Sequence, residues 1–359
     1  MGKSAVSLYA TPEAFGRASF AAMDVLRRTL GSALGAFGLD PDECPHRIVD
    51  FGPHWLLRDY GGHDTSLSLL IIATPIKRAY VWDLAPSVSA VRYFLREGLH
   101  VHLLEWMPAS RRNQNNGLNK YIGAISDCVA KISGGATGKQ PLLVGHSLGG
   151  TLAAIFSAWA PASVRGLILL GAPLCFEPAT SRFRDALVSL VPPALSDRAP
   201  FPGSLLSFVA SLASPGTFIW SRVIDTALSI TDRQALEINA RIERWALDEV
   251  RLTGKLVYQI IQWLYRENRF CRETLKVGEA LVGPSSLSVP TLAVVTMADE
   301  VAPLASIKPC IDAMPATGVR IIQYPGEVGV GLQHLGILVG RQARAHVWPE
   351  IVYWIKTCS

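Results

Sequence analysis

Ser147 lies in the run GHSLGG (residues 145–150), between an apolar stretch and an alanine-rich one. A G-x-S-x-G run between a strand and a helix is typical of a tight turn that lifts a serine hydroxyl above the end of a sheet. Its glycines let neighbouring backbone pass without a Cβ clash, and the helix that follows directs its positive end at a developing oxyanion. The run predicts a serine nucleophile; the competing interpretation is a glycine-rich turn with an idle serine.

A serine hydroxyl needs a base within hydrogen-bond reach, and that base needs a carboxylate to fix its tautomer. With this type of turn the order along the chain is serine, acid, histidine. Asp299 and Glu300 follow the apolar run 291–296, and we choose Asp299 as the acid, with Glu300 as the alternative and helix capping as the non-catalytic interpretation. His334 follows a glycine-rich loop, 35 residues (334 minus 299) beyond Asp299, and is the predicted base.

Such a site also needs N–H donors for the oxyanion. The backbone of Leu148, directly after the nucleophile, is the first expected donor. The second should come from the loop after the apolar run that ends at Thr74. Because Pro75 has no N–H, Ile76 or Lys77 is the predicted donor.

Other residues near these runs are weaker candidates for substrate contact. His146 adjoins the nucleophile and Trp106 follows an apolar run, so both are predicted substrate-binding residues, with ordinary packing as the alternative. Arg111, Arg112 and Lys120 could meet the phosphates of coenzyme A or phosphopantetheine, although basic residues between elements are usually only solvated. The cysteines are far apart and no histidine spacing indicates a zinc site, so neither metal nor cofactor is expected.

Regular elements must position these residues. Apolar runs bounded by turn residues predict strands at 46–51, 54–60, 67–74, 101–106, 141–145, 166–170, 291–296 and 320–324. Helical patterns fall at 11–39, 87–97, 121–132, from 149, 304–314 and 343–356. Strand and helix alternate, which indicates right-handed βαβ units and a mostly parallel, doubly wound sheet of the α/β-hydrolase type.

The alternation breaks after Pro173, where proline-punctuated helical sequence begins. We therefore expect an inserted, mainly helical cap. The division is an N-terminal helical segment (1–45), a first part of the α/β core (46–176), the cap (177–288) and a second part of the core (289–359). The leading helix could serve dimer or surface contact.

Composition excludes several classes of protein. The 359 residues are 49% hydrophobic and 18% charged, which indicates large buried surfaces or an apolar pocket. The net charge of +5 comes from 34 basic and 29 acidic residues without a basic block, so nucleic acid is a poor candidate partner. We expect no membrane span, and six scattered cysteines suggest reduced thiols and a cytoplasmic location.

Several stretches resemble the polyhydroxyalkanoate synthases, from about His46 to the C-terminus. The likeness is carried by the elbow at 145–150 and by the runs TPIK (74–77) with WDL (82–84), VRY (91–93) before Gly98, LYREN (264–268), ADEVAP (298–303), GILVGR (336–341) and VWP (347–349). It implies an α/β-hydrolase core with a mobile cap, often dimeric, and hydroxyacyl thioesters of coenzyme A as substrates. Two departures matter. The synthases have cysteine where this chain has Ser147, and they tend to have glycine where it has Gln333.

A serine ester is a stabler intermediate than a cysteine thioester and needs water or an alcohol to release it. The leading hypothesis is thus a serine hydrolase acting on an acyl ester or thioester, free or linked to coenzyme A or an acyl carrier protein. The alternatives are acyl transfer to an alcohol, an amine or a growing polyester; cleavage of a carbon–carbon bond next to a ketone in a β-diketone or polyketide; and a non-catalytic protein that binds polyester granules.

Overall fold

The computed structural model describes residues 12–62, 67–135, 138–193, 195–197, 199–315, 318–327 and 333–358. An eight-stranded sheet runs through the molecule in the order β1-β2-β6-β3-β7-β8-β11-β12. Its strands are β1 (Arg47–Gly52), β2 (Trp55–Asp59), β3 (Ser68–Ile72), β6 (His100–Trp106), β7 (Leu142–His146), β8 (Gly166–Leu170), β11 (Thr291–Thr296) and β12 (Val319–Tyr324). From β6 to β12 neighbouring strands are parallel, and β1 and β2 form an antiparallel edge.

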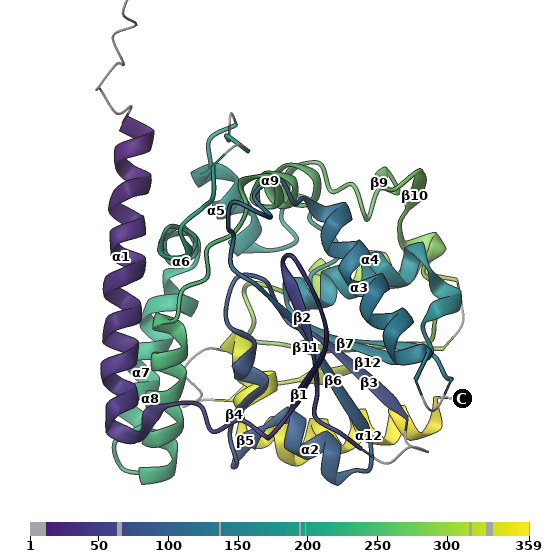
Figure 1. Cartoon of the computed structure of the whole chain (residues 1–359), viewed down its shortest axis with the longest axis horizontal. Helices are drawn as coiled ribbons and strands as arrows, with labels where there is room; N and C mark the ends of the chain where they lie inside the picture. The colour runs from purple at the N-terminus through teal and green to yellow at the C-terminus, as the bar shows by residue number, and fades with distance from the viewer. Residues whose placement is uncertain are drawn as a thin grey trace, which may run out of the picture.

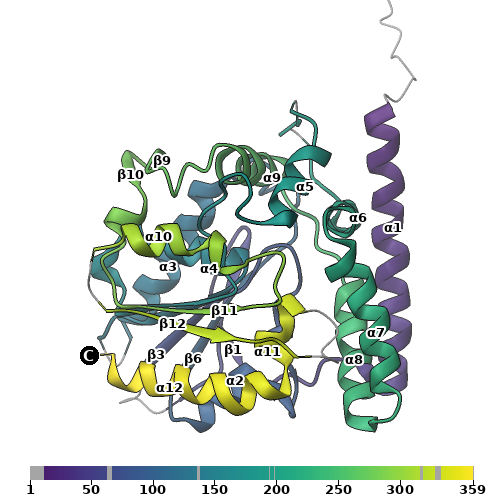
Figure 2. The same cartoon turned by 180° about the vertical axis from the view of Figure 1, so that it is seen from behind.

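Helices cover both faces of the sheet, as Figures 1 and 2 show. One face carries α3 (Leu118–Ser133), α4 (Leu148–Trp159) and α10 (Lys308–Ala313), and the other carries α2 (Ala90–Arg96) and α12 (Trp348–Thr357). Strands buried on both faces need apolar side chains at every position, and β3, β7, β8 and β11 are buried throughout. The expected α/β-hydrolase fold with its mostly parallel sheet is confirmed.

A helical region is inserted between β8 and β11. It comprises α5 (Arg182–Leu190), α6 (Gly203–Ala213), a turn of π-helix η4 (Gly216–Trp220), α7 (Ser221–Ser229), α8 (Arg233–Leu247), α9 (Gly254–Gln259) and η5 (Ile260–Arg266). A short hairpin of β9 (Leu275–Val277) and β10 (Ala280–Val282), which the sequence analysis did not predict, then leads back through η6 (Pro284–Ser286). A second unpredicted hairpin, β4 (Asp83–Ala85) with β5 (Val88–Ser89), precedes α2.

The leading helix α1 (Pro12–Leu34) packs on the inserted helices α6 and α8 rather than on the sheet (Figure 1). Asp24 of α1 is fully buried, and its carboxylate accepts hydrogen bonds from the backbone N–H groups of Gly203 and Ser204, at 3.2 and 2.7 Å. These are the first N–H groups of α6, which have no partner inside the helix. Asp24 therefore caps α6 across 180 positions of sequence, and α1 belongs structurally with the cap.

Candidate active site

The nucleophile turn joins β7 directly to α4. Ser147 has φ 53° and ψ −132°, a strained backbone conformation for a residue with a side chain, which costs about 1–3 kcal/mol and is typical of functional turns. Its N–H donates to the Leu170 carbonyl of β8 at 3.0 Å, and this bond fixes the turn against the neighbouring strand.

The glycines of the turn are required by close packing. A Cβ on Gly145 would lie 2.5 Å from the backbone nitrogen of Gly150, and a Cβ on Gly149 would lie 2.3 Å from the Ile72 carbonyl oxygen. Both distances are far inside van der Waals contact with backbone that cannot move away. The run GHSLGG is thus matched to a sharp strand-to-helix turn at the carboxyl end of β7.

Asp299 and His334 meet although 35 positions separate them. His334 Nδ1 lies 2.6 Å from Asp299 Oδ2, and the other carboxylate oxygen accepts the N–H groups of Val301 (2.8 Å) and Ala302 (3.2 Å). Burial alone raises the pKa of the Asp299 carboxyl, but the His334 imidazole and the two N–H donors outweigh it and hold the pKa below its ordinary value. The carboxylate is therefore ionised and accepts the Nδ1–H of His334.

The opposite nitrogen of that imidazole is free to act as a base. His334 Nε2 is buried and has no hydrogen-bond partner within the part of the chain that the structure describes. His334 and Ser147 line the same cavity, with Asp299 behind the imidazole. The loop residues 328–332, which precede Gln333, lie outside the described residues.

Glu300, the alternative acid, has a different role. Its carboxylate accepts the hydroxyls of Ser214 (2.5 Å) and Thr217 (3.2 Å), at the break between α6 and η4. Since Asp299 holds the histidine and Glu300 holds the cap, the geometry distinguishes two residues that the sequence left open.

His146 contacts the backbone of His334, the predicted base. Its side chain is only 4% exposed although it borders the cavity, and its Nε2 lies 2.8 Å from the His334 carbonyl oxygen. Burial and the nearby His334 lower the pKa of His146 to about 3, so the ring is neutral and donates from Nε2. The sequence left open whether His146 contacts substrate or packs, and the geometry favours packing.

Trp106 lies in the core and not at the cavity, where the sequence prediction placed it. It does not border the cavity: the indole is buried beside His54 and Tyr121, and its N–H donates to the Ala73 carbonyl oxygen at 2.7 Å. An indole N–H in the core needs such an acceptor. Trp106 therefore holds the loop that follows β3, and the prediction of substrate contact is corrected to a structural role.

The predicted oxyanion residues lie at the cavity. Leu148, Ile76 and Lys77 all line it, so the loop after β3 faces the start of α4, as the prediction requires. The Lys77 side chain turns into the protein, where its Nζ donates to Glu249 Oε2 at 2.7 Å and to the Ala246 carbonyl at 2.6 Å. Burial lowers the pKa of Lys77, and Glu249 opposes that shift.

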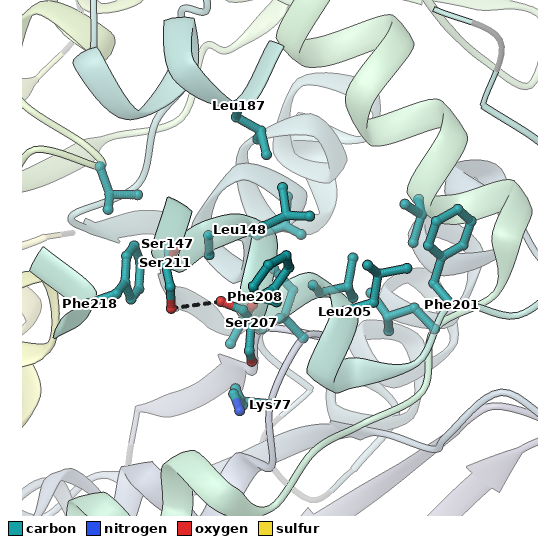
Figure 3. A pocket seen from close by; sticks show the side chains of 18 of the residues that line it. Lys77, Ser147, Leu148, Leu187, Phe201, Leu205, Ser207, Phe208, Ser211 and Phe218 are labelled. Atoms are coloured by element: carbon teal, nitrogen blue, oxygen red, sulfur yellow. Dashed lines mark hydrogen bonds between the residues drawn. The ribbon is translucent and has the colours of Figure 1, made fainter. Parts of the chain in front are cut away.

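The cavity, which we call the cap cavity, has a volume of about 570 Å³ and mostly apolar walls. Its residues come from the sheet end, from the inserted helices and from α1. In Figure 3, Ser147 and Phe218 lie toward one side, Phe201 lies toward the other, and Leu205 and Phe208 lie between them. Such a chamber suits an extended apolar chain whose reactive group lies at Ser147.

The three basic residues considered for phosphate binding do not border the cap cavity. Arg111 and Arg112 lie with Phe51 and Met107 around a separate surface depression, and Lys120 is exposed in the first turn of α3. Their position gives no support to a phosphate site beside Ser147.

One cluster could hold a divalent cation, at the end of the sheet away from Ser147. Asp59, His100 and His102 each place a ligand atom within 4.8 Å of the other two, and His100 Nε2 lies 2.7 Å from Asp59 Oδ1. Carboxylate and imidazole are ligands that zinc accepts. The members of this cluster come from β2 and β6, which are far apart in sequence, so the His-x-His spacing on β6 is the only local pattern that indicates it.

The sheet, the strained serine turn and the histidine–aspartate pair define a protein of the α/β-hydrolase class. The model of one hydrolase family, described as serine aminopeptidase, S33, matches residues 91–328. The chain belongs to this family.

Comparison with known proteins confirms the resemblance seen in the sequence. The chain is 26% identical to the poly(3-hydroxyalkanoate) polymerase subunit PhaC of Haloferax mediterranei over 81% of its own length and 59% of the relative's. It is 25% identical to that of Synechocystis sp. over 81% of its own length and 78% of the relative's. The chain thus spans about three fifths of the length of the Haloferax protein.

Among solved structures, the chain is similar to a monoacylglycerol lipase from Paleococcus ferrophilus, with a TM-score of 0.52 and 14% identity, covering 85% of this chain and 99% of the lipase. A carboxylesterase structure from Nitrososphaera gargenis gives a TM-score of 0.51 at 13% identity, covering 88% of this chain and all of that one. At such identities the likeness shows the fold alone.

Proposed function

We propose that the chain is a serine hydrolase that cleaves an apolar acyl ester or thioester through an acyl-Ser147 intermediate. The observation that carries the proposal is the 2.6 Å hydrogen bond between His334 and Asp299, made beside a large apolar cavity that Ser147 and His334 both line. A carboxylate that fixes Nδ1–H leaves Nε2 as the base that a serine nucleophile requires.

The proposed reaction proceeds in two steps. Ser147 Oγ attacks the acyl carbonyl carbon and gives its proton to His334 Nε2, and the imidazolium returns that proton to the leaving alcohol or thiol. Water then attacks the Ser147 ester and gives a proton to His334 Nε2, and the imidazolium returns that proton to Ser147 Oγ as the free acid leaves. The N–H groups of Leu148 and of Ile76 or Lys77 are the proposed donors to the oxyanion in both steps.

A second reaction, acyl transfer, is favoured by the relatives named poly(3-hydroxyalkanoate) polymerase, which match about four fifths of the chain. It uses the same residues, with a hydroxyl acceptor in place of water. The proposed substrates include thioesters of coenzyme A and of an acyl carrier protein, and the proposal does not choose between these two carriers.

The test uses chromogenic acyl esters of increasing chain length. The native chain should release the chromophore in a burst followed by slower turnover, and Ser147→Ala should abolish both. Ser211→Ala is the matched control, because Ser211 lines the same cavity and its hydroxyl bonds only to the Ser207 carbonyl in the described structure. Full activity in Ser147→Ala would refute the proposal.

Product analysis with an acyl-CoA and an added alcohol separates the two reactions. A free acid as the product supports hydrolysis, whereas a new ester or an oligomer supports transfer.

A further inference from the structure

The helices α6, η4 and α7 present an unusual outer surface, which we call the outer face. It consists of six exposed apolar side chains: Phe208, Leu212, Trp220, Val223, Ile224 and Leu228. Trp220 is 62% exposed and Val223 is 57% exposed, so more than half of the surface of each residue is in contact with solvent. Exposed apolar side chains in this number on two successive helices are typical of an interaction site.

The charged residues of this segment point inward. Between residues 203 and 230 the sequence contains only two ionisable side chains, Arg222 and Asp225. Arg222 makes a two-pronged ion pair with Glu243 of α8, and Asp225 is only 2% exposed. A helix on a water-facing surface has the opposite arrangement, with charges outside and apolar residues inside. The outer face is therefore adapted to an apolar environment.

The shape of the segment suits insertion into a surface. No single helix among the described residues is long and apolar enough to cross a membrane. The helices Gly203–Ala213 and Gly216–Ser229, taken together, have the length and the apolar composition of a membrane span. The two helices are bent by 111° at the break between them. Helices bent in this way can lie in the boundary between headgroups and acyl chains, where one face is buried and the other stays in water.

The cap cavity reaches this face. Phe208 is half exposed and also lines the cavity, and its ring lies 5.5 Å from that of Phe20 on α1. Met23, one turn further along α1, is likewise exposed and borders the cavity. An apolar chain that entered beside Phe208 would pass from the outer face into the chamber that leads to Ser147 (Figure 3).

The bend is also connected to the catalytic loop. Ser214 and Thr217, on either side of Pro215, donate their hydroxyls to Glu300, whose neighbour Asp299 holds His334. A change in the angle between α6 and α7 would therefore act on the loop that carries the acid.

We propose that the outer face binds the surface of a phospholipid bilayer that contains anionic lipid, and that the cap cavity receives its acyl substrate from that surface. The net charge of +5 favours an anionic surface over a neutral one through long-range attraction. The part of this proposal that concerns substrate entry rests on the proposed function; the binding itself does not.

The test measures sedimentation of the full chain with vesicles of phosphatidylcholine and phosphatidylglycerol in equal parts. Val223→Glu and Leu228→Glu each place a charge on the outer face, and neither side chain lines the cavity. Each should weaken vesicle binding by at least about tenfold, because an apolar contact is lost and a charge is placed against acyl chains.

Leu281→Glu is the matched control. Leu281 is 65% exposed on β10, which lies across the molecule from α7 in Figure 1, so this variant should bind vesicles as the native chain does. Circular dichroism of the three variants checks that each has folded. Turnover of a soluble short-chain ester is measured in parallel and should equal the native rate in all three variants. Its absence in the native chain would count against the proposed function and not against lipid binding.

Three results would overturn the proposal. The native chain could fail to sediment with vesicles, or the three variants could bind them equally. Alternatively, sedimentation equilibrium could show a native dimer that Val223→Glu makes monomeric while vesicle binding is unchanged, in which case a second copy covers the outer face.

Discussion

Lys77 and Glu249 form a buried ion pair that joins three parts of the molecule. The Nζ–Oε2 distance is 2.7 Å, and the backbones of the two residues pair in an antiparallel bridge. Arg27 of α1 lies 3.1 Å from the other Glu249 oxygen, and the Ser207 hydroxyl of α6 donates to Oε2 at 3.1 Å. The Glu249 side chain is completely buried. This carboxylate therefore connects the loop after β3, the N-terminal helix and the cap.

Removal of one member of a buried pair leaves a charge without compensation, at a cost of about 3–5 kcal/mol. Glu249→Gln should approach the upper end of this range at neutral pH, because Lys77 is left in a deeply buried position. Lys77→Met should cost less, because Arg27 and Ser207 still hold the Glu249 carboxylate. The double variant should be more stable than the sum of the two single losses predicts, because it removes both side chains and so leaves neither an unpaired lysine nor an unpaired glutamate in the interior.

The measurement is equilibrium unfolding in urea for the native chain, the two single variants and the double variant. The sign of a pH effect gives a second check. Because the pKa of buried Lys77 is already lowered, and lowered further once Glu249 is gone, the Glu249→Gln variant should recover stability as pH rises and the lysine loses its proton. Additive losses across the cycle, or a cost below about 1 kcal/mol for Glu249→Gln, would refute this account of the pair.

The other predictions concern the site. Asp299→Asn should reduce turnover by about 10⁴-fold with little change in KM, whereas Glu300→Gln should keep most of the turnover; equal losses in steady-state assays would contradict the separation of their roles. Trp106→Phe removes one buried donor and should cost about 1 kcal/mol in urea unfolding while leaving the preference for acyl chain length unchanged; a changed preference would place Trp106 in the substrate pocket after all. Burial lowers the pKa of His146 to about 3 in the folded chain, against about 6.5 in the unfolded chain. The unfolded state therefore takes up the proton first, and the stability of the native state should fall as the pH drops from about 6.5 toward 3. His146→Gln should reduce this dependence of stability on pH, and an unchanged dependence would count against a buried neutral ring.

Patterns that are local in sequence were predictable. The apolar runs of the central strands and the GHSLGG turn are specified within a dozen residues, so the α/β-hydrolase fold and the place of Ser147 followed from periodicity and motif. The hairpin strands that were missed, β4, β5, β9 and β10, are two or three residues each, too short to show alternation.

What the sequence could not decide depends on contacts between distant segments. Asp299 and Glu300 are adjacent, and only the position of Ser214, 86 residues earlier, shows that Glu300 holds the cap. Trp106 ends an apolar strand whether it contacts substrate or packs in the core. Only its hydrogen bond to the Ala73 carbonyl, 33 residues away, shows that the indole packs in the core. The packing of α1 on the cap likewise depends on Asp24, a buried carboxylate that the helical pattern alone does not distinguish from a solvated one.

The most direct test of the central claim is mass spectrometry of the chain after reaction with a fluorophosphonate, which forms a covalent bond with an activated serine. We expect one adduct, mapped by digestion to Ser147, with labelling lost in Ser147→Ala and slowed by orders of magnitude in His334→Ala. An adduct on another residue, or labelling of Ser147 at the native rate without His334, would contradict the proposal that this histidine activates this serine.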